Sequence, residues 1–193
     1  MLWQTRAKTD KKKDDRVQAV GSALDRLIQY AQNTGNWFLG LFDTNNKVPY
    51  NQYVDIFGAT VEQMDKEVKN VPVSHDNTML RATKEFASFL VRQLRDTQKT
   101  LNGHKKVSSM WSLLTPTVAK AGALGLALKN HANDTIKQER NDALRNLRRE
   151  FVQYPELGAK IDQLQQIMSG FGDELEKKDQ NTLLSGLTRR LEL

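Results

Sequence analysis

The side chains in this sequence that could bind a metal or carry out acid–base chemistry are few and scattered. The three histidines, His75, His104 and His131, are too far apart to share one turn of a helix. A zinc site of the His-Glu-x-x-His type needs two histidines on one helix face, and no such pair occurs. Cysteine is absent, which excludes disulfides, thiolate nucleophiles and cysteine-bound metals. We therefore expect neither a metal nor a cofactor.

One segment has the oxygen-rich start of a calcium loop. Asp43 and Asn45 occupy the first and third ligand positions of a loop of the EF-hand type. The fifth position, however, is Lys47, the sixth is Val48 where glycine is needed, and the twelfth is Val54 where a bidentate glutamate is needed. Asp and Asn also favour turns through their own side chains. The sequence therefore predicts a turn rather than a calcium site.

Motifs for nucleophilic or phosphate chemistry are missing as well. No Gly-x-Ser-x-Gly elbow, Walker loop or Gly-x-Gly-x-x-Gly stretch occurs, and Gly122 and Gly125 lie inside a helical pattern. The acids Glu139, Asp142 and Glu150 alternate with arginines at spacings that allow ion pairs within a helix. We predict that the protein is not an enzyme and has no small-molecule substrate.

The elements that would position any site are helices, because apolar residues recur every three or four positions over most of the chain. Gly35, Pro72 and Gly103 are expected to end the first three helices. Strict alternation, the mark of a strand, is almost absent. The apolar stripes lie in residues 17–31, 53–68, 79–101, 118–151, 157–171 and 183–191.

These patterns predict an all-α fold, an antiparallel bundle of five or six helices with one long helix at about 116–151. Residues 1–14 would form a basic N-terminal arm, and residues 15–193 a single helical domain. An apolar share of only 38% favours elongated helices with large solvated faces over a sphere.

The long helix would be apolar in its first half and charged in its second. Thr115 and Pro116 suit the N-cap and the first turn. The pattern leaves open whether Pro116 begins or kinks the helix, and whether Gly122 and Gly125 bend it. At 1.5 Å per residue such a helix would reach roughly 54 Å, more than a compact bundle needs.

That length supports two interpretations of its apolar stripe. The stripe could be core, with small residues that let neighbouring helices approach closely. It could also be an interface for self-assembly or for docking onto another protein of a larger assembly, such as a virion-like or membrane-linked complex. The candidate interface residues are Val118, Ala121, Gly125, Leu128, Ala132, Ile136, Ala143, Leu147 and Phe151.

A third interpretation is contact with a membrane surface. Residues 110–128 carry one charge, Lys120, but their Ser, Thr, Pro and Ala content makes the segment only weakly hydrophobic. The sequence therefore predicts no clear transmembrane span. Residues 110–128 could instead lie in the lipid interface, where nearby lysines would contact the headgroups. These lysines are Lys105, Lys106, Lys120 and Lys129. The candidate membrane contacts are Trp37, Phe38, Leu41, Phe42, Trp111, Leu113 and Leu114.

A net charge of +6 favours phosphate-bearing partners, either an anionic membrane or nucleic acid. No module for reading bases is present, so nucleic-acid binding would be independent of sequence. The candidate contacts to an anionic partner are Lys11, Lys12, Lys13, Arg16, Arg140, Arg145, Arg148 and Arg149.

We interpret the sequence as that of a non-enzymatic structural or interaction protein whose partner is itself or another protein. The alternative is a binder of anionic surfaces, either a membrane or nucleic acid. The first residues carry no apolar run typical of a signal peptide, so the default localisation is cytoplasmic and soluble. Self-association driven by apolar burial should survive high salt, whereas surface binding should weaken as salt rises.

Overall fold

In the computed structural model the chain folds into helices alone, which confirms the all-α prediction. The structure describes the backbone of residues 2–193 and the side chains of residues 15–110 and 113–193. No strand occurs in residues 2–193. The helices are α1 (Leu2–Leu41), α2 (Tyr50–Asn70), α3 (Thr78–Gly103), α4 (Met110–Leu114), α5 (Thr117–His131), α6 (Asp134–Arg149), α7 (Pro155–Lys177) and α8 (Gln180–Glu192).

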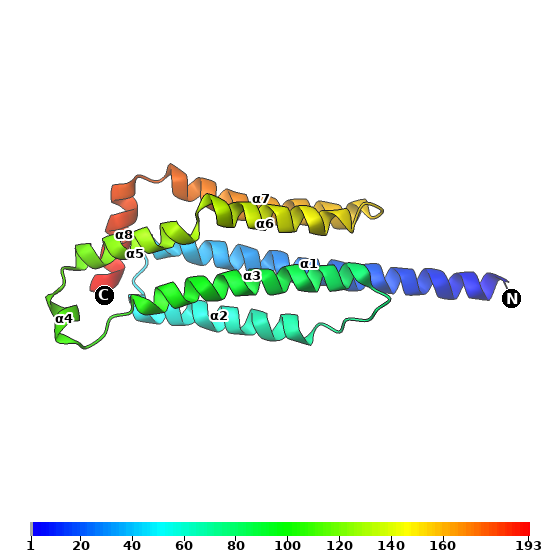
Figure 1. Cartoon of the computed structure of the whole chain (residues 1–193), viewed down its shortest axis with the longest axis horizontal. Coiled ribbons are helices and arrows are strands. Elements are labelled where there is room, and N and C mark those ends of the chain that lie inside the picture. The colour runs from blue at the N-terminus through cyan, green and yellow to red at the C-terminus, as the bar shows by residue number, and fades with distance from the viewer. Residues whose placement is uncertain (1) are drawn as a thin grey trace.

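The prediction of one long helix at 116–151 is wrong, because the segment forms two helices, α5 and α6, that are interrupted between His131 and Asp134 (Figure 1). Asn133 is the N-cap of α6, and its side-chain oxygen accepts a hydrogen bond from the backbone N–H of Ile136 at 2.9 Å. Asp134 in the first turn of α6 and the basic Lys129 and His131 in the last turn of α5 match the two helix dipoles. Local capping residues therefore stabilise the interruption between α5 and α6.

The structure answers the open question about Pro116 and shows that the expected end of the first helix at Gly35 is wrong. Pro116 is the N-cap of α5, so it begins the helix and does not kink it, and Gly122 and Gly125 lie within α5 without interrupting it. Gly35 does not end the first helix, which continues to Leu41. A methyl group on Gly35 would lie 1.8 Å from the ring of Phe171, so a residue without a side chain is needed where α7 packs on α1.

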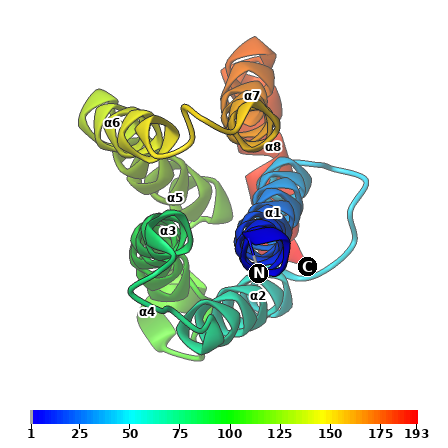
Figure 2. The ribbon, with the colours of Figure 1, turned by 90° about the vertical axis from the view of Figure 1, so that its right-hand side faces the viewer.

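The helices run mostly antiparallel along one axis, and α8 crosses one end of the bundle (Figure 1). Helix α1 packs along α7, α2 packs along α3, and α5 packs against α8. Seen end-on, α1, α2, α3, α6 and α7 surround a common interior (Figure 2). The backbone of residues 2–14, the predicted basic arm, forms the first turns of α1 and extends beyond the other helices (Figure 1).

The core divides into two clusters along the bundle. One contains buried residues of α1, α2, α3, α6 and α7, such as Leu24, Phe86 and Ile161. The other surrounds Trp37 and contains buried residues of α1, α2, α3, α5 and α8. The Trp37 ring stacks on the Tyr53 ring with centroids 4.8 Å apart. This second cluster lies at the end of the molecule that α8 crosses.

Candidate functional site

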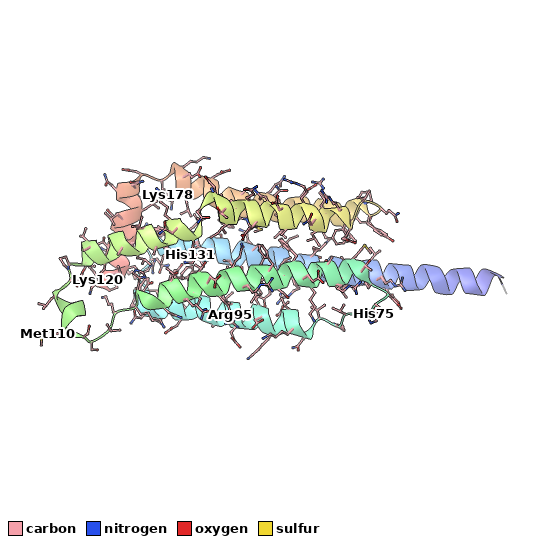
Figure 3. The ribbon with its side chains drawn as sticks, in the orientation of Figure 1. His75, Arg95, Met110, Lys120, His131 and Lys178 are labelled. Atoms are coloured by element: carbon pink, nitrogen blue, oxygen red, sulfur yellow. The ribbon has the colours of Figure 1, made fainter. Side chains whose placement is uncertain are left out.

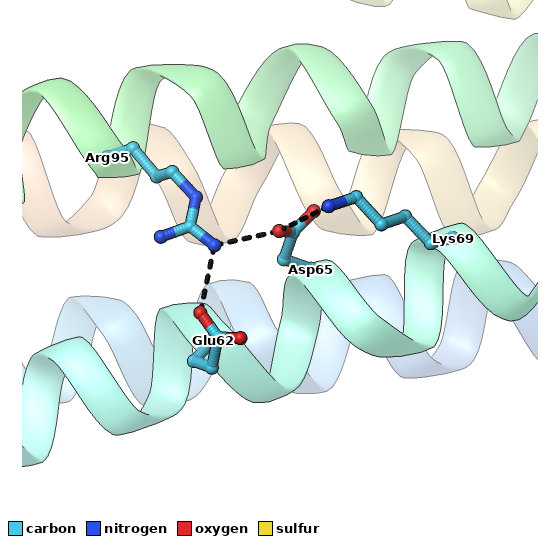
Figure 4. A network of polar contacts seen from close by, with 4 residues as sticks. All are labelled: Glu62, Asp65, Lys69 and Arg95. Carbon is cyan, nitrogen blue, oxygen red and sulfur yellow. Dashed lines mark hydrogen bonds and ion pairs between the residues drawn. The ribbon is translucent and has the colours of Figure 1, made fainter.

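Among the residues whose side chains are described, the largest network of ion pairs joins α2 to α3 (Figure 4). Arg95 donates to Asp65 at 2.7 Å and to Glu62 at 3.0 Å, and Lys69 donates to Asp65 at 3.1 Å. The hydrogen bonds from Arg95 and then Lys69 hold the pKa of the Asp65 carboxyl below its usual value. Each carboxylate has a cation partner, so the cluster offers no free acid or base.

We expect Asp65→Asn to lower the free energy of unfolding at pH 7 by about 1 kcal/mol, because one partly exposed ion network is lost. The lowered pKa means that the stabilisation is present above the unfolded value, near 3.9, and fades as the pH falls below it. Urea unfolding should therefore separate the variant from the wild type by a larger free-energy difference at pH 7 than at pH 3. Glu85→Gln, on an exposed carboxylate of α3, is the matched control and should change little.

Two of the histidines, His104 and His131, and the Asp43 loop make contacts within the protein. His104 Nδ1 lies 2.9 Å from the backbone oxygen of Thr100, and His131 Nε2 contacts the hydroxyl of the same threonine. Asp43 accepts from the backbone N–H of Asn45 at 2.9 Å, as a turn residue does. No group of three or more His, Asp or Glu within the described residues is arranged to hold a metal.

Most of the candidate interface stripe faces the protein's own core. Ala121, Leu147 and Phe151 are buried, and Leu128 and Ala143 pack against the core clusters. Gly125 and Ile136 are partly buried, whereas Val118 and Ala132 are exposed. Since α5 and α6 turn these residues toward α3, α7 and α8, the stripe does not form one continuous outer surface.

The candidate membrane residues fall into two groups. Trp37 and Leu41 are buried, Phe38 and Phe42 pack partly against the same core, and the Trp37 indole donates to the backbone oxygen of Tyr53 at 3.0 Å. These residues are therefore part of the second core cluster and not an insertion point. The side chain of Trp111 lies outside the described residues.

The candidate membrane residues of the second group, Leu113 and Leu114, are highly exposed to solvent. Leu113 and Leu114 are 79% and 72% exposed, and Met110 in the same short helix is 76% exposed. Val118 at the start of α5 and Leu126 further along it are also exposed. Among the described residues, α4 makes no extensive contact with another helix. We call Met110, Leu113 and Leu114 of α4 the apolar tip.

The apolar tip lies at one end of the molecule. Figure 3 labels Met110 at this end and His75 at the other. The connection into α4 is held by Asn51, whose side chain donates to the backbone oxygen of Lys106 at 3.0 Å and accepts from its N–H at 2.8 Å. The chain thus presents α4 outward from a fixed attachment. An exposed apolar patch of this kind typically marks an interaction site.

The segment of the chain that carries the apolar tip contains basic residues but no acidic ones. Residues 97–133 contain five lysines, Lys99, Lys105, Lys106, Lys120 and Lys129, and no Asp or Glu. Lys105 pairs with Asp55 of α2. Among the residues whose side chains are described, Lys106 and Lys129 have no carboxylate partner. The tip therefore combines large apolar side chains with a positive border.

The candidate cations elsewhere are mostly engaged within the chain. Arg16 lies 3.7 Å from Asp76, Arg145 lies 3.5 Å from Asp142, and Arg148 lies 2.6 Å from Asp162. Arg140 is partly buried, and burial lowers the pKa of its guanidinium. Arg149 is exposed, and Lys11, Lys12 and Lys13 lie outside the residues whose side chains are described. These arginines do not form a single free basic face.

The sequence analysis did not single out Arg190, the one buried charged side chain among those described. Its guanidinium donates to the backbone oxygens of Leu41 at 3.0 Å and Val48 at 2.7 Å, and also to that of Gly40. It lies 4.1 Å over the ring of Tyr53. Arg190 therefore closes the carbonyl end of α1 and fixes α8 to it, which is a structural role.

No helix among the described residues has an apolar stretch of the length that crossing a bilayer requires. Comparison of the chain with protein-family models, with curated protein sequences and with solved structures finds no match.

Proposed function

We propose that the protein binds anionic membrane surfaces peripherally, through the apolar tip and the lysines around it. The observation that carries the proposal is the exposure of Leu113 and Leu114, 79% and 72%, on a helix that makes no extensive contact with another helix among the described residues. Burying a leucine side chain is worth roughly 1.5–3 kcal/mol, and a lipid interface can supply that burial. The proposed role is binding and not catalysis.

The border of the tip favours lipid over a second copy of the chain. A symmetric dimer through the tip would bring like charges together, because the same lysines would face each other across the two-fold axis. An anionic headgroup layer would instead attract them, at about 1 kcal/mol for each basic residue near the surface. Nucleic acid would use the lysines but would leave the apolar side chains in water. Lipid is the partner that uses both features.

The test is flotation of the protein with vesicles of phosphatidylcholine alone or mixed with phosphatidylserine, at about 0.1 M and about 1 M salt. We expect binding to the mixed vesicles at low salt and much weaker binding to the neutral ones. The double variant Leu113→Ser/Leu114→Ser should weaken binding at least tenfold, since two leucines no longer enter the interface. Lys106→Gln/Lys129→Gln should weaken binding at low salt by about tenfold and reduce its salt dependence.

Matched controls separate these effects from general changes. Val152 is 78% exposed and belongs to the connection between α6 and α7, at the end of the bundle away from α4 (Figure 1), so Val152→Ser should leave vesicle binding unchanged. Lys66→Gln, on an exposed lysine of α2, is the control for charge. Absence of binding to the mixed vesicles at low salt would overturn the proposal. So would light scattering that shows an oligomer which the double leucine variant abolishes, because the tip would then be an assembly interface.

A further inference from the structure

A second apolar feature lies away from the tip, in a cleft between α1, α2 and α3 beside the connection from α2 to α3. Its volume is about 290 Å³. The floor is formed by buried apolar side chains, which are Leu27 of α1, Met64 and Val68 of α2 and Leu80 of α3. The cleft is thus continuous with the first core cluster, to which these residues belong.

The cleft exists because small residues stand where large ones would close the bundle. Ala19, Ser22 and Ala23 form the α1 side, and Ala87 forms part of the α3 side. Helix α1 packs extensively on α7, and α2 on α3, whereas α1 and α2 contact each other much less. From Ala19 to Tyr30 the α1 wall spans twelve residues, a rise of about 16 Å. The result is a narrow and elongated apolar hollow.

The polar groups of the cleft lie at its edge and leave one positive charge in excess. Arg26 and Glu67 neutralise each other across α1 and α2, with guanidinium–carboxylate distances of 2.6 and 3.2 Å. Lys84 of α3 donates to the backbone oxygens of Val71 at 3.0 Å and Lys69 at 3.3 Å. Among the residues whose side chains are described, Lys84 has no carboxylate partner. Its ammonium therefore remains available to an anion.

From this arrangement we infer that the cleft binds the acyl chain of a single-chain anionic amphiphile, such as a fatty acid, with the carboxylate beside Lys84. A polar ligand would leave its own groups unpaired against the apolar floor. A helix of a partner protein, about 10–12 Å wide with its side chains, would not enter a hollow of about 290 Å³. A second acyl chain would not fit beside the first. This site is independent of the apolar tip and of the proposed membrane binding.

The first experiment measures affinity by isothermal titration of the full chain with octanoate, decanoate and dodecanoate below their micellar concentrations. We expect affinity to rise by about fourfold for each added methylene while the chain still fills the cleft. Dodecyltrimethylammonium has the same tail and the opposite charge, and it should bind at least tenfold more weakly than dodecanoate. Absence of dodecanoate binding, or equal affinity for the two head groups, would overturn the inference.

The second experiment places the ligand by substitution. Ala23→Leu fills the hollow and should weaken dodecanoate binding at least tenfold, and Ala19→Leu at the exposed rim should act in the same direction without disturbing the core. Ala159→Leu, on an exposed alanine of α7 outside the cleft, should have no effect. If Ala23→Leu does not fold, as judged by its circular dichroism, Ala19→Leu alone decides the matter. Undiminished binding in the folded variants would overturn the site.

The role of the Lys84 charge is tested with one variant that removes the charge and one that keeps it. Lys84→Gln keeps a donor for the carbonyls of Val71 and Lys69, and it should reduce dodecanoate affinity about tenfold while sparing dodecyltrimethylammonium. Lys84→Arg should retain most of the affinity. The tip variant Leu113→Ser/Leu114→Ser should bind dodecanoate as the wild type does. If the tip variant loses dodecanoate instead, the amphiphile binds at the tip and the cleft is not its site.

Discussion

Arg190→Leu is expected to lower the free energy of unfolding by about 3 kcal/mol, measured by urea denaturation at pH 7. The substitution removes every hydrogen bond that the guanidinium donates to the oxygens of Gly40, Leu41 and Val48. The carbonyls of Gly40 and Leu41 lie at the end of α1 and that of Val48 lies just before α2, and leucine offers them no donor. The carbonyl of Gly40 still accepts a hydrogen bond from the backbone N–H of Asp43 at 3.2 Å. Leaving a buried carbonyl unpaired costs about 1–3 kcal/mol, and water that enters the site recovers part of the total.

The guanidinium is suited to this position for two reasons. Its fork of N–H groups reaches several carbonyls at once, which the single ammonium of lysine cannot do. Its positive charge also faces the negative end of the α1 dipole. Burial lowers the pKa of the Arg190 guanidinium, and an arginine stays charged in proteins even so. Arg190→Lys is therefore expected to recover only part of the lost stability.

Arg189→Leu is the matched control, because Arg189 is the adjacent residue of the same helix and is exposed. It should change the free energy of unfolding by less than about 0.5 kcal/mol. A loss below about 1 kcal/mol in Arg190→Leu would contradict the structural role assigned to this side chain, as would full rescue by lysine.

The sequence predicts the helices well where local chemistry and packing agree. The stripe of α3 and its end at Gly103 are observed as expected. The stripe of α2 also appears, and α2 ends at Asn70, before Pro72. The break between α5 and α6 was missed although Asn133 is a favoured N-cap residue. Apolar periodicity continues across the break, since α5 and α6 both bury residues on the side facing the bundle, and periodicity alone does not register a cap.

Tertiary packing decides the features that local patterns cannot. Gly35 lies inside α1, and the ring of Phe171, far along the chain, occupies the space that a side chain at this position would need. Arg190 shares the face of α8 that carries Leu187 and Leu191 and is buried with them. Its acceptors lie in residues 40–48, however, so the spacing in α8 cannot identify them. The exposure of Leu113 and Leu114 could not be predicted from the sequence either, because a short apolar run of this kind also suits a buried helix.

The two proposed binding surfaces have different relations to the fold. The apolar tip consists of large side chains that the bundle leaves uncovered, and removing them should cost little stability. The cleft consists of small side chains that leave a hollow in the bundle, and filling it changes the packing of α1 against α2. Substitutions at the tip should therefore affect partner binding alone. A substitution that fills the interior of the cleft, such as Ala23→Leu, should affect ligand binding and stability together, whereas Ala19→Leu at the exposed rim should affect ligand binding alone.

Gly186→Ala is expected to lower the free energy of unfolding by about 2 kcal/mol, although alanine is the better helix former. A methyl group at Gly186 would lie 1.9 Å from the backbone oxygen of Phe42 and 2.5 Å from its carbonyl carbon. These are backbone atoms, so α8 must move away from the end of α1. Alanine gains about 1 kcal/mol over glycine within a helix, while overpacking costs about 1–3 kcal/mol and here also weakens the contacts of Arg190. The steric term therefore outweighs the helix propensity.

Gly122→Ala separates the two terms, because Gly122 lies within α5 and a methyl group there would meet no atom within 4 Å. It should raise the free energy of unfolding by about 0.5–1 kcal/mol, so that the two glycine variants differ in sign. Hydrogen exchange in Gly186→Ala should report faster opening of α8 than of α3, since the clash acts on the attachment of α8. If both variants stabilise the protein, the close contact of α8 with Phe42 does not hold in solution. The hydrogen bonds from Arg190 to the end of α1, which depend on the same close approach of α8, would then not hold either.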